Sequence, residues 1–182
     1  MNRWKVVAGS LLIQLSNGGL YAWSVFTPYL TGQTPDGFTQ FNFTSTETQV
    51  IFSTALAAFA LVMIFAGHLQ VTIGPRVVSM AGGLILASGY ILAGLFGTSF
   101  FMQLLTIGLL GGAGIGLTYG CPIAVGMHWF PDKKGTITGI VIAGFGFGAM
   151  IWVKVAGSWG NLIDNYGVLN VFLIFGIIYG IT

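Results

Sequence analysis

Two tyrosines and one lysine carry polar chemistry inside otherwise apolar stretches of this chain. Tyr21 and Tyr119 each lie midway along a long apolar segment, and Lys154 lies toward the end of another. A phenolic hydroxyl away from water needs a hydrogen-bond partner, and a carboxylate oxygen is a good acceptor. An ionisable group in such a segment is costly enough to indicate function, because its charge could neutralise an anion. These three residues are therefore the candidate functional residues of the chain.

Each candidate also has a plainer structural interpretation. The tyrosines could bond to a carbonyl of a neighbouring helix, and Lys154 lies close enough to the end of its segment for its stem to carry the ammonium group to the interface. Three further candidates are Trp23, Gln14 and Asn17. They either line the same site or pack and hydrogen-bond between helices.

The inventory of reactive side chains does not support an enzyme. Four acids, two histidines and one cysteine are scattered along the chain, with no zinc-ligand spacing and no pair of carboxylates within one segment. The glycine spacing from Gly112 to Gly116 is like that of a dinucleotide fingerprint, but it lies inside an apolar segment rather than between a strand and a helix. A formal charge of +2 gives no support for nucleic-acid binding. We therefore expect no enzyme activity, metal, cofactor or nucleic-acid partner.

Long apolar segments must position these residues, and they predict an all-α membrane protein. The chain is 55% hydrophobic and only 5% charged, against roughly 25% charged in soluble domains, so lipid must cover its surface. We expect one domain, residues 1–182, with six transmembrane helices at about 4–30, 47–72, 77–97, 100–127, 136–159 and 168–182. The last segment would rise only ~22 Å, against ~30 Å of hydrocarbon. We therefore expect the chain to be cut within its sixth span.

The basic residues alternate along the breaks between these segments. Arg3 and Lys5 precede the first segment, Arg76 separates the second from the third, and Lys133 and Lys134 separate the fourth from the fifth. The intervening breaks carry acids or no charge. Because short loops rich in Lys and Arg stay cytoplasmic, the pattern predicts a multi-pass protein of the cell membrane with its N-terminus inside.

Polar residues at two helix starts suggest local contacts. Thr46, with Gln49 three residues later, predicts a capping box that opens the second helix. Asp132 suits the N-terminus of the fifth helix, where a carboxylate is favoured. We also hypothesise that Asp132 bonds Arg76 across the inner face and latches the outward-open state.

A faint repeat divides the six segments into three and three. Gly19-Leu20-Tyr21 is echoed by Gly116-Leu117-Thr118-Tyr119, and an odd number of spans per copy would invert the second copy, giving a 3+3 inverted repeat. Small residues let transmembrane helices approach closely. We expect this packing role for seven glycines: Gly112, Gly114, Gly116, Gly139, Gly144, Gly146 and Gly148.

Three motifs carry a family resemblance. They are Trp129-Phe130-Pro131-Asp132-Lys133-Lys134-Gly135 with the following Gly144-Phe145-Gly146-Phe147-Gly148, Tyr21-Ala22-Trp23-Ser24-Val25-Phe26, and the run from Gly112 to Gly120. Together they resemble the oxalate/formate antiporter family of the major facilitator superfamily, over essentially the whole chain. The resemblance implies the N-terminal six-helix half of a twelve-span carrier for small carboxylates such as oxalate, formate, pyruvate or lactate, working by alternating access. It also implies that Tyr21 and Tyr119 line the substrate cavity, and that the partners are a small carboxylate, the lipid bilayer and a missing C-terminal half.

The resemblance has limits at the inner loops and at the substrate positions. Residues that fit the gating and inner-loop pattern are Gly67, Gly74, Arg76, Asp132, Lys133 and Lys134. Val71, however, stands where the superfamily usually has an acid, and Leu20 stands where the oxalate carrier has a polar residue. The resemblance therefore does not identify the substrate of this chain. Two alternatives remain: a membrane module that transports nothing, and a homodimeric carrier in which two copies make one pathway.

Overall fold

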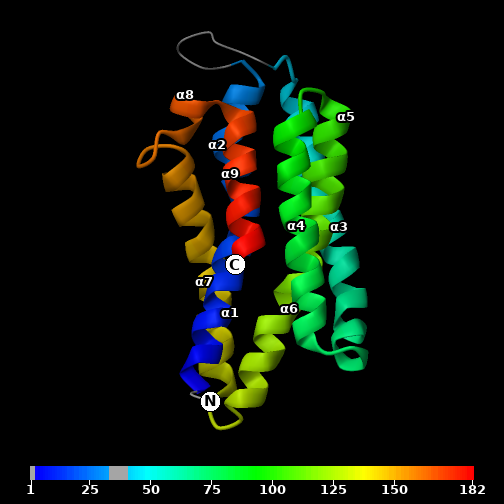
Figure 1. Ribbon diagram of the computed structural model, residues 1–182, viewed down its shortest axis with the longest axis vertical. Coiled ribbons are helices and arrows are strands. Elements are labelled where there is room, and N and C mark those ends of the chain that lie inside the picture. Colours follow the sequence, from blue (N-terminus) through cyan, green and yellow to red (C-terminus); the bar gives the residue numbers. More distant parts are fainter. Residues whose placement is uncertain (1–2, 33–40) are drawn as a thin grey trace.

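The computed structural model describes residues 3–32 and 41–182, and the described chain consists of helices and their connections. Asp36, expected in the first outer loop, lies outside the described residues. The elements in chain order are α1 (Arg3–Asn17), η1 (Gly18–Ala22), α2 (Trp23–Leu30), α3 (Ser45–Thr72), α4 (Pro75–Phe96), α5 (Phe100–Gln103), η2 (Leu104–Gly111), α6 (Gly112–Trp129), α7 (Lys134–Ala156), α8 (Leu162–Tyr166) and α9 (Val168–Ile181). The long helices run roughly side by side along one axis (Figure 1).

Among the described residues, four helices are long and apolar enough to cross a membrane. They are α3, α4, the continuous run Phe100–Trp129 that joins α5, η2 and α6, and α7. The first predicted span is helical throughout, but the 3₁₀ segment η1 divides it into two shorter α-helices, and α9 has only 14 residues. An all-helical membrane protein is therefore supported, while the count of six spans and the 3+3 repeat remain predictions.

The start of α3 differs from the prediction by two residues. Thr44, not Thr46, is the N-cap: its hydroxyl accepts from the Glu47 backbone N–H at 3.2 Å, and the Glu47 carboxylate accepts from the Thr44 backbone N–H at 2.7 Å. The preceding Phe43 is buried, and its N–H donates to the Leu30 carbonyl at 3.1 Å. This contact holds the chain extended up to residue 44, so the helix begins directly afterwards.

Glycines of α6 allow close contact with its neighbours. A side chain added at any of three positions would collide with backbone: Gly112 with Ala55 and Gly116 with Phe59, both of α3, and Gly114 with Leu86 of α4. These positions need glycine because the helix backbones approach too closely for a Cβ atom.

In α7 the predicted glycine set divides into two groups. Gly144 and Gly148 lie against α1, where added Cβ atoms would meet Leu11 and Leu15 respectively. Gly139 and Gly146 have no such neighbour within 4 Å among the described residues. A packing role for these two glycines therefore stays a prediction. Residues two positions apart, such as Gly144 and Gly146, point to different sides of a helix, whereas those three or four apart share a face.

The two ends of the bundle differ in charge. The N-terminus, the α3–α4 turn and the α6–α7 loop lie at one end, and the α4–α5 turn and α8 lie at the other (Figure 1). The first end therefore gathers five of the six basic residues, each at or next to a helix end: Arg3, Lys5, Arg76, Lys133 and Lys134. Two acids lie at the opposite end: Glu47 near the start of α3 and Asp164 in α8.

Candidate functional site

Five aromatic side chains from four elements form a continuous cluster that contains both candidate tyrosines. The members, called the tyrosine cluster below, are Tyr21 of η1, Phe52 and Phe59 of α3, Tyr119 of α6 and Phe145 of α7. Each ring meets the next edge to face, with centroids 5.2 to 6.0 Å apart. Such contacts fix ring orientation as well as position. The structure thus brings together two residues that are far apart in sequence.

Phe145 is the ring that joins the two tyrosines. Its centroid lies 5.5 Å from that of Tyr21 and 5.2 Å from that of Tyr119. Tyr21 keeps 43% of its surface exposed, and Tyr119 is half-buried. Within the described part of the chain neither phenolic hydroxyl has a hydrogen-bond partner. Both donors are therefore free to bind a ligand, instead of being taken up by a neighbouring helix carbonyl.

The local backbone explains how Tyr21 reaches this position. At Gly18, the first residue of η1, an added Cβ would collide with the Phe145 carbonyl oxygen and lie 2.6 Å from the Ala149 nitrogen. Only glycine allows η1 to lie directly on the α7 backbone at that point. Tyr21, three residues further along, then meets the ring of Phe145.

Gln14 and Asn17 lie inside the bundle and are both 0% exposed. The Asn17 amide Nδ2 donates to Gln14 Oε1 at 3.1 Å, and Thr118 Oγ1 donates to Asn17 Oδ1 at 2.8 Å. Gln14 Nε2 has no partner in the described chain. The two amides therefore join α1 to α6 from within and do not line the face that carries the tyrosine cluster.

Trp23 is also a core residue in the structure. Its indole N–H donates to the Thr48 carbonyl at 3.0 Å, and its ring stacks on Phe172 of α9 with centroids 6.3 Å apart. With 5% of its surface exposed, it offers no face to a ligand. The plainer interpretation, helix packing, accounts for this residue.

Lys154 lies on the opposite side of α7 from Phe145. The two residues are nine positions apart, which is about two and a half helical turns. Lys154 instead continues an exposed apolar stripe of Ile140, Phe147 and Met150, near the end of α7. An apolar stripe with a lysine at its end is the arrangement expected of a side chain that reaches for the interface. The structure does not bring Lys154 to the tyrosine cluster.

Contacts at the basic end correct one prediction. Asp132 pairs with Arg3, with Nη1 and Oδ1 3.7 Å apart, and Arg3 lies over the Phe130 ring at 4.9 Å. The proposed bond between Asp132 and Arg76 is therefore wrong for this conformation. Arg3 takes the partner role because α1 begins beside the α6–α7 loop (Figure 1).

The remaining inner-loop candidates have separate surroundings. Gly74 has φ +90° and precedes Pro75, so the tight α3–α4 turn requires a glycine. Gly67 has no neighbour within 4 Å of an added Cβ, and Lys133 and Lys134 are exposed at the start of α7. Gly67 therefore has no packing role in the described chain.

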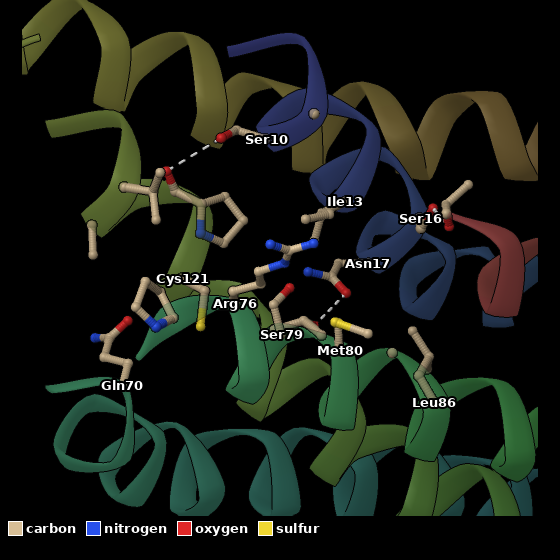
Figure 2. Close-up of a pocket in the computed structure, with 18 of the residues that line it drawn as sticks. Ser10, Ile13, Ser16, Asn17, Gln70, Arg76, Ser79, Met80, Leu86 and Cys121 are labelled. Carbon is tan, nitrogen blue, oxygen red and sulfur yellow. Dashed lines mark hydrogen bonds between the residues drawn. The ribbon is translucent and has the colours of Figure 1, made fainter. Parts of the chain in front are cut away.

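A large cavity lies elsewhere in the bundle, between α1, α4, α6 and the end of α9. Its volume is about 1240 Å³, and Arg76 points into it from the start of α4 (Figure 2). The residues that line it include Asn17 and Thr118 but neither Tyr21 nor Tyr119. Gly180 to Thr182 form one edge, since α9 ends midway along the bundle (Figure 1). We take the tyrosine cluster as the candidate site because it carries two hydroxyl donors without a partner in the described chain.

These features define a multi-pass α-helical membrane protein with a cluster of free hydroxyl donors between its helices. The chain belongs to the Major Facilitator Superfamily, whose sequence profile matches residues 8–182. Several relatives of the chain are named as transporters or carriers.

Three relatives illustrate the similarity. The chain is 28% identical to the uncharacterized MFS-type transporter YhjX of Escherichia coli over 97% of this chain and 41% of that protein. It is 27% identical to the oxalate:formate antiporter of Oxalobacter formigenes over 99% of this chain and 40% of that protein. A third relative, apicoplast pyruvate carrier 1 of Toxoplasma gondii, is 31% identical over 61% of this chain and 20% of that protein. The chain thus spans about two fifths of the length of the first two.

Proposed function

We propose that this chain is the N-terminal half of a secondary transporter for small organic anions, such as oxalate, formate, pyruvate or lactate. The observation that carries the proposal is the meeting of two tyrosine rings, from η1 and α6, on the ring of Phe145, with neither hydroxyl bonded in the described chain. Carboxylate oxygens accept such donors well. The names of two relatives, an oxalate:formate antiporter and a pyruvate carrier, support the same substrate class.

In this proposal a second half completes the site. The tyrosine cluster contains only uncharged side chains, whereas a carboxylate in a low-dielectric cavity also needs an opposite charge. That charge would come from the facing half, and the substrate would be held where the two halves meet. Rocking of one half against the other would then open the site to each side of the cell membrane in turn.

Uptake measurements test the proposal. The intact gene product is reconstituted in proteoliposomes with labelled oxalate, formate, pyruvate and lactate, alone and as the variants Tyr21→Phe and Tyr119→Phe. We expect saturable uptake of at least one anion, with KM raised about fivefold in each variant because one hydrogen bond to the anion is lost. Tyr166→Phe is the matched control, since Tyr166 is an exposed tyrosine in α8.

Two results would contradict the proposal. No saturable uptake of any of the four anions by folded protein would remove the transport function. Uptake with the same KM in all three phenylalanine variants would keep the transport function and remove the tyrosines from the site.

A further inference from the structure

We propose that Asn17 and Thr118 are positioning residues that set the geometry of the two site tyrosines. The inference rests on the function proposed above and concerns side chains outside the tyrosine cluster. Thr118 Oγ1 lies 2.8 Å from Asn17 Oδ1, although the residues are 101 positions apart in sequence. Asn17 is 0% and Thr118 is 3% exposed. The same hydroxyl also lies 3.0 Å from the Gly114 carbonyl oxygen of its own helix, and Asn17 Oδ1 is the nearer acceptor.

The bond joins the two segments immediately beside the site residues. Asn17 is the last residue of α1, and η1, which carries Tyr21, begins at the next residue. Thr118 directly precedes Tyr119 in α6. A hydrogen bond at this position therefore fixes the distance between the backbones from which both tyrosines project.

A second contact completes the arrangement on the α7 side. Gly18, adjacent to Asn17, lies against the backbone of Phe145 and Ala149. The segment with Tyr21 is thus held to α6 by Asn17 and to α7 by Gly18. Because both tyrosine rings rest on Phe145, small shifts of either contact would change where their hydroxyls point.

The polar pair also controls the rotation of α6. Thr118 and Tyr119 are successive helical residues, about 100° apart around the helix axis. A rotation that moves Tyr119 relative to Tyr21 also moves the Thr118 hydroxyl away from Asn17. A hydrogen bond weakens steeply away from its preferred angle, whereas an apolar contact between the same helices has little directional preference. The pair therefore resists the rotation that would separate the tyrosines.

Thr118→Val and Thr118→Ser test this inference in the intact gene product. Valine keeps the shape and removes the hydroxyl, while serine keeps the hydroxyl. We expect Thr118→Val to raise KM for the transported anion about fivefold, with maximal rate per folded protein little changed, and Thr118→Ser to restore the wild-type KM. If the valine variant does not fold, Thr118→Ala removes the same hydroxyl and requires no extra space.

Thr106→Val is the matched control. Thr106 is equally buried in the same predicted span, but its hydroxyl donates at 2.7 Å to Met102 of its own helical run and not to another helix. Its substitution should leave KM unchanged. An equal rise in KM for Thr106→Val and Thr118→Val would show a general packing effect and overturn the positioning role.

A double variant links the effect to the tyrosines. If Thr118 acts through Tyr119, Thr118→Val should add little to the KM already raised by Tyr119→Phe. Fully additive effects would overturn the inference. Absence of uptake by the wild-type protein would instead contradict the proposed function, so the two failures are distinguishable.

Discussion

At the scale of single residues, Tyr21 and Tyr119 each have a packed aromatic ring and an unbonded hydroxyl group. Their rings are fixed by edge-to-face contacts with Phe145 and with the phenylalanines of α3. Their hydroxyls remain without a partner in the described chain. Aromatic side chains have few rotatable bonds, so holding the ring also aims the hydroxyl. A site built in this way presents its donors before the substrate arrives.

Lys154 yields a prediction of the opposite kind. Since it lies about two and a half turns from Phe145, we expect Lys154→Ala to leave KM for the transported anion within about twofold of wild type. Uptake by the intact gene product in proteoliposomes measures this. Lys154→Arg, which keeps a charged side chain of similar reach, is the companion variant. A large loss of uptake in alanine with recovery in arginine would place the charge in the transport pathway.

The sequence predicts the two tyrosines as site residues, but it does not predict which rings surround them. Phe145 lies in a motif that carried the family resemblance, and Phe52 and Phe59 are separated by two helical turns, yet an isolated sequence does not show which helix faces which. Residue type and place also make Gln14, Asn17 and Trp23 candidates for the site, whereas all three side chains are buried in the structure. Their orientation depends on the 3₁₀ segment η1 and on neighbours distant in sequence.

At the scale of helices, glycine position decides how close two elements lie. Gly148 of α7 lies against Leu15 of α1, while Gly146, two residues earlier, has open space. We expect Gly148→Ala to destabilise the protein by about 1–3 kcal/mol, because the added methyl group forces the helices apart. Gly146→Ala should be neutral or stabilising by up to about 1 kcal/mol, because alanine favours the helix.

Thermal unfolding of the detergent-purified protein compares these two variants directly. The same substitution in the same helix cancels differences in helix propensity, so the gap between the two melting temperatures reports the α1–α7 contact. Equal melting temperatures for both variants would show that α1 and α7 do not pack as closely as described.

Apolar run length predicted where the helices lie, because chain segments in lipid must satisfy their own backbone hydrogen bonds. Finer features needed tertiary contacts. Thr44 and Thr46 both have an acidic or amide residue three positions later, and only the bond from Phe43 to Leu30 selects the first. Likewise, the short helix α8 lies in a segment expected to be a loop. The sequence pattern around Thr44 and Thr46 favours both residues equally as the N-cap of α3, and tertiary contacts select Thr44.

At the scale of the whole molecule, charge and helix direction agree. The N-terminus, the α3–α4 turn and the α6–α7 loop share one end of the bundle (Figure 1), and five of the six basic residues lie in or next to these segments. Lys154 is the exception, and it lies near the other end of α7. Successive helices run in opposite directions, so alternate connections lie at opposite ends of the bundle. The charge difference between alternate connections is therefore a charge difference between the two ends. Such a bias in Lys and Arg orients a multi-pass protein during insertion.

This asymmetry predicts that the basic end faces the cytoplasm. Labelling of an introduced cysteine tests the prediction. Lys134→Cys and Asn165→Cys place thiols at exposed positions at opposite ends. The native Cys121 is buried, so wild-type protein should react little and serves as the background control. A membrane-impermeant maleimide added to intact cells should label Asn165→Cys, and should label Lys134→Cys only after permeabilisation. The reverse result would mean that the basic end is outside. Labelling of both cysteine variants in intact cells would contradict a fixed orientation of the protein in the membrane. It would also contradict the proposal that the site opens to each side of the membrane in turn.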